Sequence, residues 1–254
     1  MDEPEAVAEF HAAGSEMSLP VYDFNARALG RLLPHGGTLL DLGSGSARLL
    51  GYLAQRRPDL RIVGLDLSDE MLLLGRRWLA EVGVDDRVEL RKADITCFDS
   101  DALGELDAVS CVWALHHLPT NDLVTACLRR IETTCRRTKC AVWLFDFIRY
   151  RDARTFPAVV AAFRSPGHAA TRDGIASERA AFTYEELRGH LNGAGLGELR
   201  GAWGRLVGMY QCHWIRGGRA FVADNRAWKD APLAWNLRAL AALMAREFPA
   251  DVGS

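Results

Sequence analysis

The sequence predicts an α/β fold in which a doubly wound, mostly parallel β-sheet carries helices on both faces. From residue 38 onward, short apolar runs alternate with helical patterns, which is typical of βαβ units. Each run is apolar enough to form a strand that is covered from both sides. The 254 residues suffice for one large domain of this class or for two small ones. The expected strands are 38–42, 61–66, 87–92, 107–112 and 139–147.

Capping residues mark where the intervening helices begin. Ser68 precedes a segment whose first turn holds Asp69 and Glu70, and carboxylates suit the positive end of a helix dipole. Thr120 precedes a second helical pattern, and Thr183 with a glutamate three residues later forms a capping box for a third. The expected helices cover 68–83, 120–135 and 183–196. In the first of them, the apolar positions at helical spacing are Met71, Leu74, Trp78 and Val82.

Three segments fall outside this alternation. Residues 1–36 are expected to form an N-terminal helical lid on a central domain of 37–216. Residues 148–182 are expected to form a cap, whose six arginines exceed its acids by three and either bind an anionic substrate or only solvate the surface. Residues 217–254 are expected to form a helical extension that packs on the domain or joins two subunits of a homo-oligomer. Its apolar stripe consists of Leu233, Leu237, Leu240, Met244 and Phe248.

Composition and charge argue against several classes of protein. The 31 Lys and Arg against 33 Asp and Glu leave a net charge of −2, which argues against a protein held on nucleic acid by its phosphates. No uncharged stretch is long enough to cross a bilayer, and the first residues are acidic where an export signal is basic. The six cysteines lack CxxC spacing, which indicates reduced thiols. We therefore expect a cytoplasmic protein without a membrane partner or a metal site.

The glycine-rich segment 39–50 is the most informative part of the chain. A buried strand runs into Gly43, Ser44 and Gly45 and then into a helix, which allows a ligand to approach the backbone closely. Asp66 ends the next strand, where a carboxylate can accept hydrogen bonds from ribose hydroxyls. An arginine stands where a dinucleotide loop has its third glycine, so NAD is disfavoured, and the Gly-Lys-Ser/Thr of a Walker loop is missing.

Four segments in combination, DLGSGSA, GLDLS, KADI and VWALHHLP, resemble the motifs of the class I S-adenosylmethionine-dependent methyltransferases. The resemblance covers about residues 20–216, and the last segment is similar to the branch that acts on small molecules or quinones. Ala47 stands where the family often has a further glycine. The resemblance implies a Rossmann-like sheet of seven strands whose last strand is antiparallel, which fits two further strands near 198–207 and 209–216.

The resemblance also implies a cofactor, S-adenosyl-L-methionine, with S-adenosyl-L-homocysteine as its product. The residues that it places around this cofactor are Tyr22, Arg27, Asp41, Gly43, Ser44, Gly45, Asp66, Leu67, Met71, Asp94 and Ile95. Two alternatives stay open. In the first, the carboxylate of Asp94 caps only local amides. In the second, Tyr22 and Phe24 only anchor the helix on which they lie, and Arg27 extends along the surface without binding a ligand.

Methyl transfer from a sulfonium is an in-line displacement, to which proximity and orientation contribute about 7–11 kcal/mol in well-positioned cases. An alcohol, phenol or protonated amine also needs a base to accept its proton. His116 and His117 follow the fourth strand, at the sheet edge where ligands bind, and are the catalytic candidates together with Tyr22. Asp146 and Arg149, at the end of the fifth strand, either bind substrate or pair with each other.

The function expected from the sequence is the transfer of a methyl group to an oxygen, nitrogen or carbon of a small molecule. His168 and Tyr184 are expected to line the acceptor pocket from the cap, while His213 and Trp214 are expected to pack in the core. One alternative is a macromolecular acceptor, RNA or protein, against which the net charge argues. The other is a binding or scaffold protein that keeps the fold without catalysis.

Overall fold

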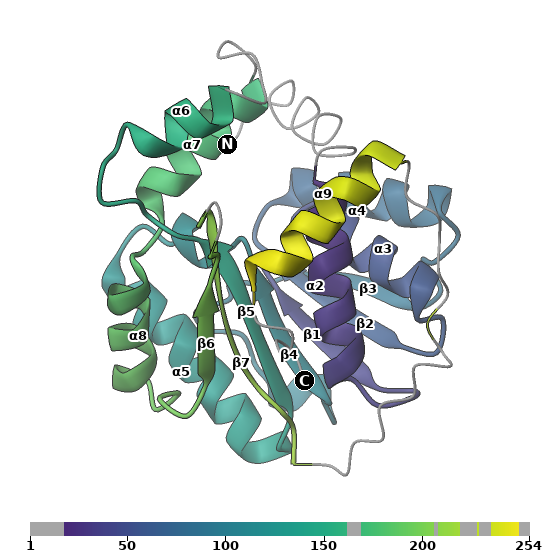
Figure 1. Cartoon of the computed structure of the whole chain (residues 1–254). Helices are drawn as coiled ribbons and strands as arrows, with labels where there is room; N and C mark the ends of the chain where they lie inside the picture. Colours follow the sequence, from purple (N-terminus) through teal and green to yellow (C-terminus); the bar gives the residue numbers. More distant parts are fainter. Residues whose placement is uncertain (1–17, 162–168, 206–207, 219–227, 229–234, 249–254) are drawn as a thin grey trace.

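Seven strands form one sheet at the centre of the molecule (Figure 1). The computed structural model describes residues 18–161, 169–205, 208–218, 228 and 235–248. The strands lie side by side in the order β3-β2-β1-β4-β5-β7-β6. Their bounds are β1 (Thr38–Leu42), β2 (Arg61–Asp66), β3 (Val88–Lys92), β4 (Ala108–Val112), β5 (Ala141–Phe147), β6 (Arg200–Trp203) and β7 (Tyr210–Ile215).

The sheet is parallel from β3 to β5, and β7 is inserted antiparallel between β5 and β6. Because β1 lies between β2 and β4, the chain builds the sheet outward in both directions from its centre, as in doubly wound folds. The predicted fold class is confirmed, including the seven strands and the antiparallel last strand. The sixth strand is shorter than expected, since it covers only Arg200–Trp203 of the predicted 198–207.

Helices cover both faces of the sheet (Figure 1). One face packs against α2, α3, α4 and α9, and the other packs against α5 and α8. The cap predicted after the fifth strand contains two helices, α6 and α7. The helix bounds are α2 (Leu19–Leu32), α3 (Arg48–Arg56), α4 (Asp69–Glu81), α5 (Asn121–Thr138), α6 (Thr155–Ala161), α7 (Ala169–Ala180), α8 (Tyr184–Gly193) and α9 (Trp235–Glu247), with short 3₁₀ turns at η1 (Asp101–Leu103) and η2 (Leu115–His117).

The predicted helix caps are confirmed. The side chains of Ser68 and Thr120 accept hydrogen bonds from backbone N–H groups of the first turn of α4 and α5. Thr183 forms the complete capping box with Glu186 at the start of α8. These side chains satisfy amide groups that the helix itself leaves unpaired, so they fix where each helix begins.

The buried face of α4 differs from the predicted stripe. The residues of this helix that are fully buried are Leu72, Gly75 and Leu79, whereas Met71, Leu74, Trp78 and Val82 are only partly buried. A glycine brings the helix close to the sheet, because a Cβ on Gly75 would lie 2.7 Å from Leu90. A pattern based on large apolar residues misses such a contact, since the contact depends on a missing side chain.

α2 and α9 pack against each other and against the sheet. The Phe24 and Phe248 rings are stacked with centroids 4.8 Å apart, and Phe24 also contacts Trp143 on β5. Asn25 accepts a 2.8 Å hydrogen bond from the indole N–H of Trp143. Met244 and Phe248 of the predicted C-terminal stripe are buried, while Leu233 and the side chains of Leu237 and Leu240 lie outside the described part of the chain. Whether residues 1–36 act as a lid, and whether the C-terminal helix also joins subunits, stay predictions.

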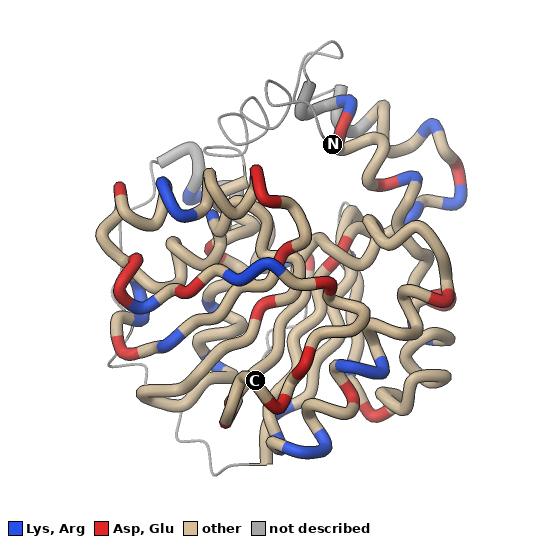
Figure 2. The backbone as a smooth tube through the Cα atoms, turned by 180° about the vertical axis from the view of Figure 1, so that it is seen from behind, with Lys and Arg blue, Asp and Glu red and all other residues tan. Residues whose placement is uncertain are grey.

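Charged residues of both signs are interspersed along the described backbone, as the view from behind shows (Figure 2). Among the described helices, none has the length and the apolar composition that spanning a bilayer requires.

Candidate functional site

The glycine loop connects β1 to α3 at the carboxyl edge of the parallel strands. The backbone N–H groups of Gly43 and Ser44 both donate to the Leu65 carbonyl, at 2.8 and 2.9 Å. Gly43 has φ +73°, and a Cβ there would lie 2.4 Å from that of Ala114, so no side chain fits. Gly45 has φ +52°, but a Cβ there would meet no atom within 4 Å. The loop therefore packs tightly through its first glycine and is open to a ligand at its second.

Asp66 ties the glycine loop to the end of β2. One carboxylate oxygen accepts from the N–H of Gly45 at 2.7 Å, and the other accepts from the N–H of Ser68 at 2.9 Å. The next residue, Leu67, is 65 % exposed, which is unusual for a large apolar side chain. Met71 lies one turn into α4 and is partly buried. A carboxylate and an apolar surface thus lie side by side next to the open glycine.

Asp41 is buried beneath the loop, next to the β4 residue Ser110, whose hydroxyl donates to it at 2.5 Å. Burial raises the pKa of Asp41 to about 7, and the nearby charge of Asp66 acts in the same direction, against the effect of the Ser110 hydrogen bond. Asp41 therefore supports the loop from below, with a carboxyl group that gains a proton near neutral pH.

Asp94 follows β3 at the same edge of the sheet. Its carboxylate accepts from the backbone N–H and the hydroxyl of Thr96, at 2.8 and 2.7 Å, and these bonds lower its pKa. This is the local capping that the sequence left as an alternative. The group is nevertheless exposed, so its remaining lone pairs are accessible, and Ile95 beside it is partly buried.

Tyr22 and Arg27 point in different directions from α2 and have different partners. Tyr22 packs edge-to-face on Trp113, with ring centroids 5.9 Å apart, and lies near Arg48 at the start of α3. Burial raises the pKa of Tyr22 to about 12, so its hydroxyl stays protonated at neutral pH. Arg27 instead pairs with Asp23 at 2.8 Å. The two residues stand five positions apart on α2, a rotation of about 140° at 3.6 residues per turn.

His116 and Asp146 form a buried pair at the ends of the neighbouring strands β4 and β5. The Nδ1 atom of His116 lies 2.6 Å from a carboxylate oxygen of Asp146, and the other oxygen accepts from the backbone N–H of His116 at 3.2 Å. The exposed fractions of the two side chains are 2 % and 3 %. An ionised carboxylate only accepts, so it fixes the proton on Nδ1 and leaves Nε2 with a free lone pair.

The other candidates near the expected acceptor site, His117 and Arg149, differ in exposure and in contacts from what the sequence suggested. His117 is exposed, although its ring lies beside that of His116, with centroids 4.1 Å apart and the ring planes tilted by 41°. Asp146 and Arg149 do not pair with each other, because Asp146 holds His116 and Arg149 binds the carbonyl of Ala181 and the carboxylate of Glu186. The alternative in which Asp146 and Arg149 pair with each other is therefore wrong, because each of them has other partners.

Tyr184 lies over β6 and β7, where its ring contacts Trp203 and stacks on His213. His213 and Trp214 are buried, as expected for packing residues. His168 lies outside the described residues.

The sequence did not reveal the roles of three residues at this edge. Asp146 was not recognised as the partner of His116, and Arg48 was noted only as a missing glycine, although its guanidinium lies 4.1 Å from the centre of the Trp78 ring. Trp113 takes φ +55°, which costs energy for an aromatic residue and is typical of functional sites. The signal available for Asp146 was its place at the end of a strand that neighbours the one before His116.

Several buried polar atoms at this edge have no hydrogen-bond partner within the described residues. They are Ser44 Oγ, Trp113 Nε1 and His116 Nε2. Buried polar groups normally find partners, so such atoms indicate groups that a ligand supplies. Together with the open backbone at Gly45, the Asp66 carboxylate and the exposed Leu67, they fit a ligand that combines a ribose, an apolar ring and polar ends. S-adenosylmethionine is such a ligand.

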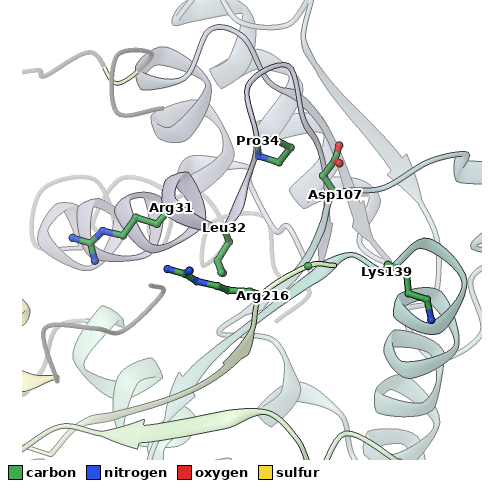
Figure 3. A pocket seen from close by; sticks show the side chains of 7 residues that line it. Arg31, Leu32, Pro34, Asp107, Lys139 and Arg216 are labelled. Atoms are coloured by element: carbon green, nitrogen blue, oxygen red, sulfur yellow. The ribbon is translucent and has the colours of Figure 1, made fainter. Parts of the chain in front are cut away.

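A pocket at the opposite, amino edge of the strands is a separate feature (Figure 3). It lies between the end of α2, the start of β4, the end of α5 and the segment after β7. The residues that line it are Arg31, Leu32, Pro34, Asp107, Lys139, Arg216 and Gly217.

Comparisons with known proteins agree with this arrangement. Residues 39–137 match a family model described as a methyltransferase domain. The ubiquinone biosynthesis O-methyltransferase of Dechloromonas aromatica is 33 % identical over 98 residues, which cover 38 % of this chain and 40 % of the relative. The chain spans less than half the length of the curated relatives that it matches first.

Solved structures show the same fold. A SAM-dependent methyltransferase from Aquifex aeolicus has a TM-score of 0.59 at 15 % identity, and the match covers 84 % of this chain and 98 % of that one. An O-methyltransferase from neocarzinostatin biosynthesis, solved with S-adenosyl-L-homocysteine and 1,4-dihydroxy-2-naphthoic acid, has a TM-score of 0.50 at 17 % identity, over 71 % of this chain and 49 % of that one. Residues 39–137 are thus a methyltransferase domain, and the fold of the chain around them is that of solved S-adenosylmethionine-dependent methyltransferases.

Proposed function

We propose that this protein transfers a methyl group from S-adenosylmethionine to an oxygen or nitrogen of a small molecule, with His116 as the base. The observation that carries the proposal is the buried pair of His116 and Asp146, which lies at the same sheet edge as the glycine loop and leaves Nε2 free. A base is needed when the acceptor atom carries a proton, as in a hydroxyl or an ammonium group.

The glycine loop, Asp66 and Leu67 would hold the cofactor. The open backbone at Gly45 would receive its methionine portion, the carboxylate of Asp66 would accept from its ribose, and Leu67 would cover its adenine. Asp94 and Ile95 lie at the next strand end, within the same edge. When bound, S-adenosylmethionine supplies a methyl group on a positively charged sulfur.

The chemistry of the chain's own residues is then proton removal and positioning. His116 Nε2 accepts the proton of the acceptor atom, whose lone pair forms the new bond to the methyl carbon as the carbon–sulfur bond breaks. Asp146 keeps the ring oriented and stabilises the positive charge that the ring gains. Trp113 and Phe147, whose rings stack with centroids 5.8 Å apart, exclude water beside the histidine.

Two of the similar proteins support a small acceptor, whereas another curated relative is named for methylation of ribosomal RNA. The curated relative from Dechloromonas aromatica is named for O-methylation in ubiquinone biosynthesis. The neocarzinostatin enzyme was solved with a dihydroxynaphthoic acid. Both names refer to aromatic hydroxyl compounds or to a quinone pathway, in agreement with the aromatic side chains around His116 in this chain.

The test is to replace the base and to follow methyl transfer to an accepted phenol or amine. We expect His116→Gln to lower kcat by about 10²–10⁴ and to remove the acidic limb of the kcat/KM pH profile, because the base is lost. Asp146→Asn should give a smaller loss in the same direction. His35→Gln, an exposed histidine at the opposite edge, is the matched control. An unchanged pH profile in His116→Gln would assign the acceleration to proximity alone.

A further inference from the structure

The cap helix α7 turns its acidic side chains inward and its arginines outward. Glu178 is 1 % exposed and Asp173 is partly buried, whereas Arg172 and Arg179 are exposed. The inner side of α7 contacts η2, the turn that carries His116. Buried carboxylates are rare unless they are paired. The cap thus presents an acidic face where it meets the candidate base.

Only one of the two carboxylate oxygens of Glu178 accepts a hydrogen bond from the described residues. Its Oε1 accepts from the backbone N–H of Tyr150 at 2.8 Å. Its Oε2 is buried and has no hydrogen-bond partner within the described residues, as is also true of Nε2 of His116. An unpaired carboxylate oxygen is costly to bury, so this atom indicates a donor that arrives with a ligand.

Asp173 lies five residues before Glu178 on the same helix. Burial raises the pKa of Asp173, whereas the charge of His116 lowers it. Such an effect of one group on the other means that the two groups lie near each other. Five residues on a helix correspond to a rotation of about 140°, so the acidic face is the arc of α7 between Asp173 and Glu178, opposite Arg172 and Arg179.

Aromatic rings connect the two ends of this face. Tyr150, which binds Glu178, has its ring centroid 6.2 Å from that of Phe156. Phe156 lies 6.0 Å from Phe147, and Phe147 lies 5.5 Å from the His116 ring. The faces of aromatic rings attract cations, and carboxylates beside them strengthen this attraction. Rings and carboxylates in this combination suit a cationic group.

The cap arginines are used elsewhere or face solvent. Arg149 binds Glu186 and the Ala181 carbonyl, and Arg154 is paired with Asp152 on the surface. Arg151, like the two arginines of α7, is exposed, and Arg164 lies outside the described residues. Among the described arginines of the cap, the exposed ones, Arg151, Arg154, Arg172 and Arg179, thus place their positive charge at its surface.

We propose that the acceptor carries a protonated amine, which binds between these aromatic rings and the carboxylates of Glu178 and Asp173. This inference rests on the proposed function, because it names the substrate class of that site. An ammonium group has three donors and no acceptor, so it satisfies the free oxygen of Glu178. A substrate carboxylate at the same place would meet two like charges. The proposal reverses the sign of charge that the composition of the cap suggests.

The test uses the full chain saturated with S-adenosyl-L-homocysteine and three probes that share a phenol ring. Tyramine carries an ammonium group, 4-ethylphenol is neutral, and 4-hydroxyphenylacetate carries a carboxylate. Isothermal titration calorimetry gives the affinity of each. We expect tyramine to bind at least about tenfold more tightly than 4-hydroxyphenylacetate, with 4-ethylphenol between them, because electrostatic complementarity discriminates between the charges.

Substitutions then assign this preference to α7. Glu178→Gln keeps an oxygen that accepts from Tyr150 and removes only the charge, so tyramine should lose about fivefold or more in affinity while 4-ethylphenol and S-adenosyl-L-homocysteine keep theirs. Asp152→Asn removes an exposed carboxylate of the cap and should change nothing. Asp173→Asn is the second variant and carries the test if Glu178→Gln does not fold.

The outcomes separate this inference from the proposed function. Tyramine that binds no more tightly than 4-hydroxyphenylacetate, including the absence of binding by any probe, overturns the amine proposal. A Glu178→Gln protein that keeps the full preference, or that loses S-adenosyl-L-homocysteine binding, also overturns it. Wild-type protein that binds the probes but not S-adenosyl-L-homocysteine contradicts the proposed function instead.

Discussion

Gly43 tolerates no side chain for two separate reasons. Its φ of +73° is strained for any L residue, and a Cβ would collide with Ala114 at 2.4 Å. Gly43→Ala should therefore lower the free energy of unfolding by about 2–4 kcal/mol, from backbone strain and overpacking together. Gly45→Ala has strain without a collision and should cost only about 1–2 kcal/mol. Urea denaturation of both variants checks this order, and equal losses would contradict the packing described here.

Asp41 makes stability depend on pH. Burial raises its pKa from 3.8 to about 7, so the folded protein holds a proton that the unfolded chain releases above about pH 4. The stabilisation is complete below pH 4 and is lost as the pH rises through 7. Each pH unit in this window corresponds to about 1.4 kcal/mol.

Asp41→Asn stays neutral at every pH, so its stability relative to wild type should increase by roughly 3–4 kcal/mol between pH 4 and pH 7. Urea denaturation at intervals of one pH unit measures this difference. Asp69→Asn, an exposed carboxylate on α4, is the matched control and should show no such trend. A constant difference between Asp41→Asn and wild type would show that Asp41 is ionised in the folded protein.

At the scale of single residues, sequence and structure agree where chemistry is local. The glycines and Asp66 could be placed because a tight turn and a strand end fix them within one segment. The role of Asp146 could not, because it depends on β4 and β5 being neighbours, which no local pattern states. Arg27 faces Asp23 for a similar reason: the face of a helix that turns toward the site is decided by what packs on it.

α2 is attached to the sheet by one buried polar contact within an apolar interface. Asn25 is fully buried and accepts from the indole N–H of Trp143, which is itself fully buried. Asn25→Ala should cost about 1–3 kcal/mol of unfolding free energy, because it leaves that N–H without a partner. Asn121→Ala, at an exposed position of α5, should change stability by less than about 0.5 kcal/mol. A loss below 0.5 kcal/mol for Asn25→Ala would mean that the indole finds another partner.

At the scale of elements, capping residues placed the starts of α4, α5 and α8, because each cap is encoded within four residues. The buried face of α4 differs from the predicted stripe, because Gly75 lets the helix approach the sheet closely without adding apolar area of its own. In the cap, too, a local pattern does not predict which side chains face the protein interior. The composition of the cap is basic, yet α7 buries Glu178 and partly buries Asp173, and only the orientation of the helix shows which charges face the site.

At the scale of the whole molecule, the order of the strands in the sheet brings the residues of the candidate site together. The ends of β2, β1, β4 and β5 are consecutive at the carboxyl edge, so the Asp66 carboxylate, the glycine loop, His116 and Asp146 follow one another along it. The alternation of strands and helices predicted this edge, because parallel strands joined by crossovers all end on the same side. In the function that we propose, the cap and the segments around it determine the acceptor, and no sequence motif predicts how these segments pack.

Isothermal titration calorimetry can measure whether this edge of the sheet binds S-adenosylmethionine. We predict binding of S-adenosylmethionine and not of NAD. Asp66→Ala should weaken the binding by about 10–100-fold, because a charged hydrogen bond is lost, while Asp69→Asn should leave it unchanged. Binding of NAD as tight as that of S-adenosylmethionine, or an Asp66→Ala protein with wild-type affinity, would contradict the account.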